Sequence, residues 1–197
     1  DFEDIPVGTT DLFNTTQLLW VETSKVDATV RDVAGDRQAE YEVISGDEYA
    51  KFGGIGIADH DNLAELVTGK TYTFSIFIDM SDASTNALMW IEYQNNTFGW
   101  CGVKVFQTGS IELINSGNNL SGVSYVDHVL TFTFKAGIYS ETENSYFSLT
   151  GQRFSVANKV LVDDIKIQRA YDVYASDFEN ETVGNTTVSH FYNSSFA

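Results

Sequence analysis

Apolar and polar residues alternate along much of this chain, and that period of two is the feature that most restricts its fold. In TYTFSIFID, residues 71–79, the alternation places Tyr72, Phe74, Ile76 and Ile78 on one face of an extended strand. The stretches ALMWIEY, VLTFTFKA and VLVDDIKIQ alternate in the same way, and turn-rich sequences such as SGDE, VTGK, SGNN and LTGQ separate the strands. Many short strands joined by turns predict an all-β fold, and we expect an antiparallel β-sandwich.

The charge of the chain limits its partners. Its 197 residues carry a formal net charge of −17 and include 11 Lys and Arg residues. Phosphate backbones and anionic lipids are bound by clustered cations, so we expect no nucleic-acid partner and no attachment to acidic membranes. Because no apolar stretch approaches the length of a bilayer span, we also expect no membrane insertion. The acidity fits solubility, a salty habitat or, for a few carboxylates, calcium binding, since calcium prefers oxygen ligands.

Cysteine content and the first residue bear on the compartment. Cys101 is the only cysteine, so there is no disulfide framework and no CxxC metal motif, and its strand-like surroundings in WCGVKVF predict a small buried side chain. The chain begins at Asp1 without Met, which is expected of a mature secreted or trimmed fragment. Six Asn-x-Ser/Thr sequons do not contradict an extracellular or cell-surface location, which we expect.

A phrase at the start of the chain returns near its end. Residues 1–10 read DFEDIPVGTT and residues 177–186 read DFENETVGNT. We therefore expect a β-sandwich module over residues 1–170, followed at 171–197 by a linker plus the first strand of a following repeat, or by a docked tail. Coincidence is the alternative, because the shared phrase is short. The tail is too small to form a core of its own.

Three motifs in order carry a resemblance to a known family. They are Phe2-Glu3 followed by Gly8, GKTYTFSIFI at 69–78, and VLVDDIKIQ at 160–168. In this order and spacing the chain resembles the carbohydrate-binding modules of the families 4, 9 and 22 group, which are jelly-roll β-sandwiches attached to bacterial polysaccharide-degrading enzymes. The resemblance implies a jelly-roll module of a larger multidomain protein. Its function would be non-catalytic carbohydrate binding that targets a secreted or cell-surface bacterial protein to a polysaccharide or oligosaccharide.

The resemblance also implies one structural calcium ion. Its ligands would be Glu3 and either Asp163 or Asp164, with Asp164 favoured because alternation along a strand points only one of the two toward Glu3. Carboxylates brought together by the first and last strands repel unless a cation lies between them. Asp32 or Asp36 could add a further ligand. The alternative is that these acids are solvated charges that protect a sheet edge.

Sugar binding requires flat apolar rings for the C–H faces of a sugar and polar groups for its hydroxyls. We expect a platform on the polar face of the alternating strands, where Phe77, Trp90 and Glu92 have core-like neighbours. The stretch EYQNNTFGW, residues 92–100, is the densest mixture of amides and rings. Further candidates in loops and at strand ends are Gln94, Trp100, Trp20, Tyr49 and Phe98. The alternative for each Trp is a place in the core.

Catalytic patterns are weak, and we expect no enzyme. The 28 acidic residues include pairs at glycosidase spacing by chance alone. No G-x-S-x-G nucleophile motif occurs, and FGGIGIAD lacks the Lys and Ser or Thr of a phosphate loop. The competing hypothesis is a structural or adhesive repeat of a surface array, with the same fold and no sugar site. A small glycan-active enzyme is a third and weaker reading.

Overall fold

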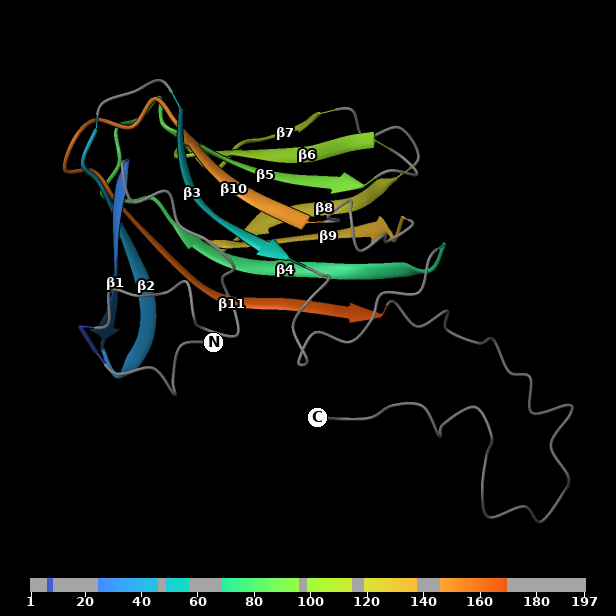
Figure 1. Ribbon diagram of the computed structural model, residues 1–197, viewed down its shortest axis with the longest axis horizontal. Coiled ribbons are helices and arrows are strands. Elements are labelled where there is room, and N and C mark those ends of the chain that lie inside the picture. Colours follow the sequence, from blue (N-terminus) through green and yellow to red (C-terminus); the bar gives the residue numbers. More distant parts are fainter. Residues whose placement is uncertain are drawn as a thin grey trace, which may run out of the picture.

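Eleven strands, all in antiparallel pairs, make up the part of the chain that the structure describes (Figure 1). The structure is a computed structural model. It describes residues 7–8, 25–45, 49–56, 69–95, 99–114, 119–137 and 146–169. Within these ranges no helix is long and apolar enough to cross a membrane. The predictions for Glu3, Trp20, Phe98 and the 171–197 tail lie outside the described residues.

The strands form two sheets. The six-stranded sheet has the order β1 (Val26–Val33), β2 (Asp36–Val43), β11 (Lys159–Arg169), β4 (Thr71–Asp79), β9 (Val129–Lys135) and β8 (Leu120–Val126). The five-stranded sheet has the order β3 (Tyr49–Gly56), β10 (Tyr146–Gln152), β5 (Leu88–Asn95), β6 (Gly99–Phe106) and β7 (Ile111–Ile114). One sheet packs on the other, so the predicted antiparallel β-sandwich is confirmed.

Strands that are distant in sequence pair in both sheets, as expected for a jelly roll. β11 lies between β2 and β4, and β10 lies between β3 and β5. β11 therefore has a hydrogen-bonded neighbour on each side. The pairing with β2 ends at Val162, so Asp163 pairs with β4 alone, and the alternative that Asp163 and Asp164 are charges at a strand edge stays open.

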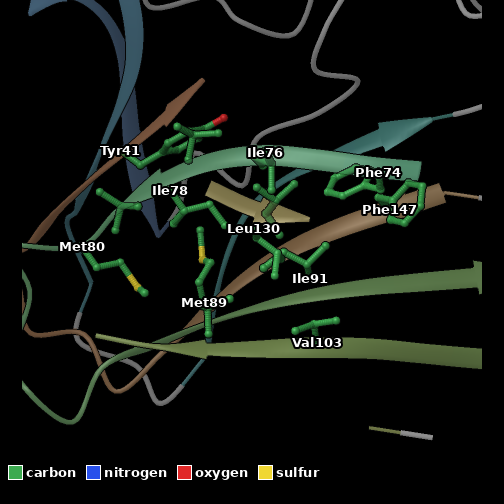
Figure 2. Packing of buried hydrophobic residues seen from close by; sticks show 14 of the residues in the cluster. Tyr41, Phe74, Ile76, Ile78, Met80, Met89, Ile91, Val103, Leu130 and Phe147 are labelled. Atoms are coloured by element: carbon green, nitrogen blue, oxygen red, sulfur yellow. The ribbon is translucent and has the colours of Figure 1, made fainter. Parts of the chain in front are cut away.

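The core lies between the sheets and follows the alternation read from the sequence. On β4, Tyr72, Phe74, Ile76 and Ile78 are all at most 5% exposed. Figure 2 shows Ile76 and Ile78 directed toward Met89 and Ile91 of the opposite sheet. Burying each of these side chains stabilises the fold by roughly 1.5–3 kcal/mol.

Aromatic rings join the two sheets at one end of the core. The ring centroid of Phe147 on β10 lies 4.4 Å from that of Phe74 on β4 and 4.8 Å from that of Tyr93 on β5. Phe74 also stacks on Phe132 of β9 at 5.0 Å. Such contacts add about 0.5–1.5 kcal/mol per pair beyond the area that they bury. The cluster thereby fixes which face of each strand is turned outward.

Cys101 on β6 is fully buried in this core, as predicted. Burial raises the pKa of its thiol to about 11, and the negative charge of Glu92 acts in the same direction.

We predict that Cys101 reacts with a disulfide reagent at pH 8 much more slowly in the native protein than in urea. The raised pKa alone reduces the thiolate fraction by roughly 100-fold, and burial blocks access as well. Absorbance of the released chromophore measures both rates, with Cys101→Ala as the blank. Equal rates in the native and unfolded states would contradict the buried position.

Candidate functional site

The outer face of the five-stranded sheet collects one ring and several polar groups. On β5, Met89, Ile91 and Tyr93 point into the core, so Trp90 and Glu92 between them point outward. The register places Lys104 of β6 beside Trp90. Because cross-strand partners share a face, outward residues from β5, β6, β7 and β10 form a continuous surface. We call this surface the Trp90 face; it consists of Trp90, Glu92, Gly102, Lys104, Glu112, Ser148 and Thr150.

The indole Nε1 of Trp90 approaches Gly102 of the neighbouring strand β6 closely. A Cβ atom built on Gly102 would lie 2.7 Å from the indole Nε1 of Trp90 and 2.6 Å from the backbone oxygen of Ile91. Only a residue without a side chain leaves the indole this space. The Trp90 side chain is half-buried, so one part of it contacts the sheet while another part remains open to solvent. The sequence analysis missed Gly102, although a glycine inside a strand often marks such a close approach.

Charged groups border the indole. Nζ of Lys104 lies 5.5 Å from the centroid of the Trp90 ring, within the range of a cation–π contact. The same ammonium lies 4.0 Å from Oε1 of Glu112 on β7. Glu112 is half exposed, so this ion pair contributes little to stability. Its effect is to hold the Lys104 ammonium over the face of the ring.

Hydrogen-bonding groups continue the face on the other side of Trp90. The hydroxyl of Ser148 on β10 donates to Oε2 of Glu92 across 3.5 Å, a long hydrogen bond. Thr150 is the register partner of Trp90 and is mostly buried although it belongs to the outward set. Carboxylate and ammonium groups thus border one partly exposed ring, and the hydroxyl groups of Ser148 and Thr150 are buried beside it. This combination can stack on an apolar ring face and exchange hydrogen bonds with hydroxyl groups at its rim.

Three other predicted residues lie in the same sheet. Gln94 follows Glu92 by two positions on β5, and its register partner is Trp100 of β6. Tyr49 begins β3 and pairs with Gln152 of β10. The backbone therefore places all three predictions in the five-stranded sheet.

Phe77 belongs to the other sheet. It lies on β4 and alternates with inward Ile76 and Ile78, so it points outward from the six-stranded sheet. Its ring centroid lies 5.9 Å from that of His128. The prediction that Phe77 shares one face with Trp90 and Glu92 is therefore wrong, because the outer faces of the two sheets lie on opposite sides of the sandwich. Alternation separates inward from outward residues, but it does not assign a strand to a sheet.

Charged side chains gather in one hollow on the outer face of the six-stranded sheet. Glu40, Asp79, Asp82 and Lys159 line a shallow hollow of about 120 Å³ there. Nζ of Lys159 pairs with Glu40 at 3.0 Å and with a second carboxylate, that of Glu42, at 3.5 Å. The residues that line this hollow include no aromatic ring, which distinguishes it from the Trp90 face.

The two acids of the VLVDDIKIQ strand have different environments. Asp163 is 4% exposed, whereas Asp164 is exposed and its Oδ1 accepts a hydrogen bond from Nζ of Lys166 at 2.7 Å. The pairing of β11 with β4 shifts between Asp163 and Lys166, and Asp164 has a φ of 49°. This irregularity breaks the alternation on which the preference for Asp164 was based. Of the two, Asp163 is the buried carboxylate.

Electrostatics at Asp163 differ from those of an ordinary surface acid. Burial raises the pKa of its carboxyl group most, a backbone hydrogen bond from Asp164 and the positive charge of the chain's amino terminus lower it, and the nearby Asp36 raises it again. Asp32, the other predicted ligand, accepts a hydrogen bond from the backbone N–H of Gly35 at 2.8 Å in the β1–β2 turn. Among the described residues no group of three His, Cys, Asp or Glu side chains could hold a metal ion.

Comparison with known proteins finds likenesses of fold only. No protein-family model and no curated protein sequence matches the chain. One similar structure was described in a study of the promiscuous specificity of carbohydrate-binding modules from the β-sandwich superfamily. The two chains are 16% identical, and the TM-score is 0.43. The match covers 86% of this chain and 60% of that chain. A second is the mannan-recognising module TmCBM27, at 5% identity and a TM-score of 0.38 over 72% of this chain and 79% of that one.

A third similar structure is an exo-β-agarase, at 14% identity and a TM-score of 0.41, where the match covers 83% of this chain and 25% of that one. The chain thus spans 60% of the first of these structures and a quarter of the agarase.

We predict that Gly102→Ala displaces the Trp90 indole and destabilises the fold by about 1–3 kcal/mol, because a backbone oxygen cannot yield to the new methyl group. The indole N–H resonance of Trp90 and the urea midpoint measure the two effects. Gly109→Ala is the control, since nothing lies within 4 Å of its Cβ position and only its φ of 86° is strained. An unshifted Trp90 resonance in Gly102→Ala would contradict the close approach of the indole to Gly102.

Proposed function

We propose that this chain is a non-catalytic carbohydrate-binding module that holds a polysaccharide or oligosaccharide on the Trp90 face. The single observation that carries the proposal is the half-buried indole of Trp90, laid over Gly102 and bordered by Glu92, Ser148 and Lys104. The exposed part of the indole would stack on the C–H face of a sugar ring. Glu92 would accept hydrogen bonds from sugar hydroxyls, and Lys104 would donate to them.

The electrostatics of this face favour binding over hydrolysis. A glycosidase requires one carboxylic acid in apolar surroundings that keep it protonated. Glu112 instead lies beside the ammonium of Lys104, and Glu92 accepts a hydrogen bond from Ser148. Neither carboxylate therefore lies in the purely apolar surroundings that a glycosidase gives its general acid. Adhesion within a surface array, without a sugar site, is the alternative if no glycan binds.

The biological setting belongs to the same proposal. The motifs Phe2-Glu3, GKTYTFSIFI and VLVDDIKIQ support membership of the families 4, 9 and 22 group. We place the module in a larger secreted or cell-surface bacterial protein, which it would target to a glycan. The repeated DFE phrase supports a division into a module at 1–170 and a following segment at 171–197.

A structural calcium ion completes the proposed module. Asp163 is a buried carboxylate close enough to Asp36 for their charges to interact, so a divalent cation between them would remove a repulsion. Asp163 therefore fits the ion as an oxygen ligand, and the negative charge of Asp36 close by favours a cation there. Glu3, outside the described residues, remains the proposed ligand from the start of the chain.

We predict that Trp90→Ala weakens glycan binding by about 10- to 100-fold, because the stacking surface is removed. Isothermal titration against xylans, β-glucans, mannans and pectins, with calcium present, first finds the ligand and then compares variants. Phe77→Ala is the matched control: it removes an outward ring from the other sheet and should leave the affinity unchanged. Circular dichroism checks that both variants are folded.

Two outcomes of that experiment would contradict the proposal. If no glycan binds the wild-type chain, sugar recognition fails and the adhesive alternative is favoured. If Phe77→Ala abolishes binding and Trp90→Ala does not, the sugar lies on the six-stranded sheet instead.

We predict that calcium raises the melting temperature and that a chelator reverses the change. At 100 times the dissociation constant, a ligand of the folded state stabilises it by about 2.7 kcal/mol, which is about 5–10 °C for a chain of this length. Differential scanning calorimetry with calcium, with magnesium and with a chelator measures the shift. Identical melting curves in calcium and chelator would exclude the calcium site and leave the sugar proposal standing.

A further inference from the structure

The side-chain amide oxygen of Gln38, on β2, is buried and accepts no hydrogen bond from the described residues. Its side chain is 7% exposed, although it points away from the core in alternation with Ala39 and Tyr41. Its Nε2 donates a hydrogen bond of 2.7 Å to Oδ2 of Asp36. Within the described residues no donor reaches its Oε1, and that atom is buried. An acceptor that is shielded from water and has no donor costs free energy, so it requires an explanation.

The orientation of the Gln38 amide follows from chemistry. An ionised carboxylate can only accept hydrogen bonds, so the nitrogen of the amide must face Asp36 and the oxygen must point the other way. Asp36 therefore fixes the direction of Oε1, in the same way that outer carboxylates orient the ligands of many metal sites.

Asp163 lies next to Gln38 across the strands. Val162 of β11 pairs with Ala39 of β2, and the antiparallel register then brings the residue after Val162 beside the residue before Ala39. Those residues are Asp163 and Gln38, each more than nine-tenths buried. The charge of Asp36 also acts on Asp163. Oxygen atoms from three side chains thus gather between β2 and β11.

Three cations of the six-stranded sheet pair with carboxylates outside this group. Nζ of Lys166 pairs with Asp164, and Lys159 and Arg31 both pair with Glu40.

We propose that Oε1 of Gln38 is a ligand of the calcium ion, beside the carboxylate of Asp163, and that Asp36 is a positioning residue that orients the amide. Calcium takes six to eight oxygen ligands and accepts side-chain amide oxygens among them. A bound ion would satisfy the buried oxygen and offset the repulsion between the two carboxylates. This inference rests on the calcium ion of the proposed function, and it names Gln38 where the sequence analysis named Asp32 and Asp164.

The test compares Gln38→Leu with the wild-type chain. Leucine is similar in size but has no oxygen, so calcium affinity measured by isothermal titration should fall at least 10-fold. In chelator the variant should be as stable as the wild type or more stable, because the buried acceptor is gone. A purely structural Gln38 gives the opposite pattern, with stability lost in chelator and calcium affinity unchanged. That pattern would overturn the proposal.

Two further variants keep the result interpretable. Gln107→Leu, in the turn between β6 and β7, is the matched control and should leave calcium affinity unchanged. Gln38→Glu supplies a carboxylate oxygen at the same position and covers the case in which Gln38→Leu fails to fold. Its melting temperature should fall in chelator and recover in calcium, so that the gap between the two conditions is wider than in the wild type. A gap equal to that of the wild type would overturn the proposal.

The experiment distinguishes failure of the Gln38 inference from failure of the calcium proposal on which it rests. If the wild-type chain binds no calcium at millimolar concentration, the calcium proposal and this inference fail together, while sugar binding is unaffected. If the wild type binds calcium and Gln38→Leu binds it equally well, only this inference fails.

Discussion

Packing of rings between the two sheets is the constraint on which the outer surfaces depend. Phe147 of β10 stacks on Phe74 of the opposite sheet and on Tyr93 of the paired strand β5. A strand that buries one set of side chains must present the other set to the outside. Rotating β5 to expose Trp90 differently would pull Met89 and Ile91 out of the core. The Trp90 face is therefore held in place by residues that no ligand on that face contacts.

The two outer faces have different chemistry although they alternate in the same way. The five-stranded sheet places an aromatic ring over a glycine, while the hollow on the six-stranded sheet is lined by Glu40, Asp79, Asp82 and Lys159. A charged surface binds and releases water and ions readily, whereas a ring supported by backbone offers a rigid apolar patch. The sandwich thus separates proposed sugar recognition on one side from proposed ion binding at the β2–β11 boundary on the other.

The sequence predicted inward and outward residues well, because that information is local. The strand at 71–79 was read correctly from alternation alone, and Cys101 was correctly assigned to the core. Sheet membership depends on pairing between distant strands, so Phe77 was grouped with the wrong face. Gly102 and Gln38 were missed because their importance arises from a neighbouring strand. The preference for Asp164 rested on regular alternation, which the irregularity in β11 interrupts.

The position of β11 also has a consequence for how the chain acquires its structure during synthesis. β2 and β4 belong to the first half of the chain. The strand that pairs with both of them, β11, consists of residues 159–169 and is synthesised much later. Until the ribosome has released that segment, each of the two strands exposes a row of unpaired backbone groups. A nascent chain of this design is open to association with other chains for most of its translation, and a chaperone or rapid export would shorten that interval.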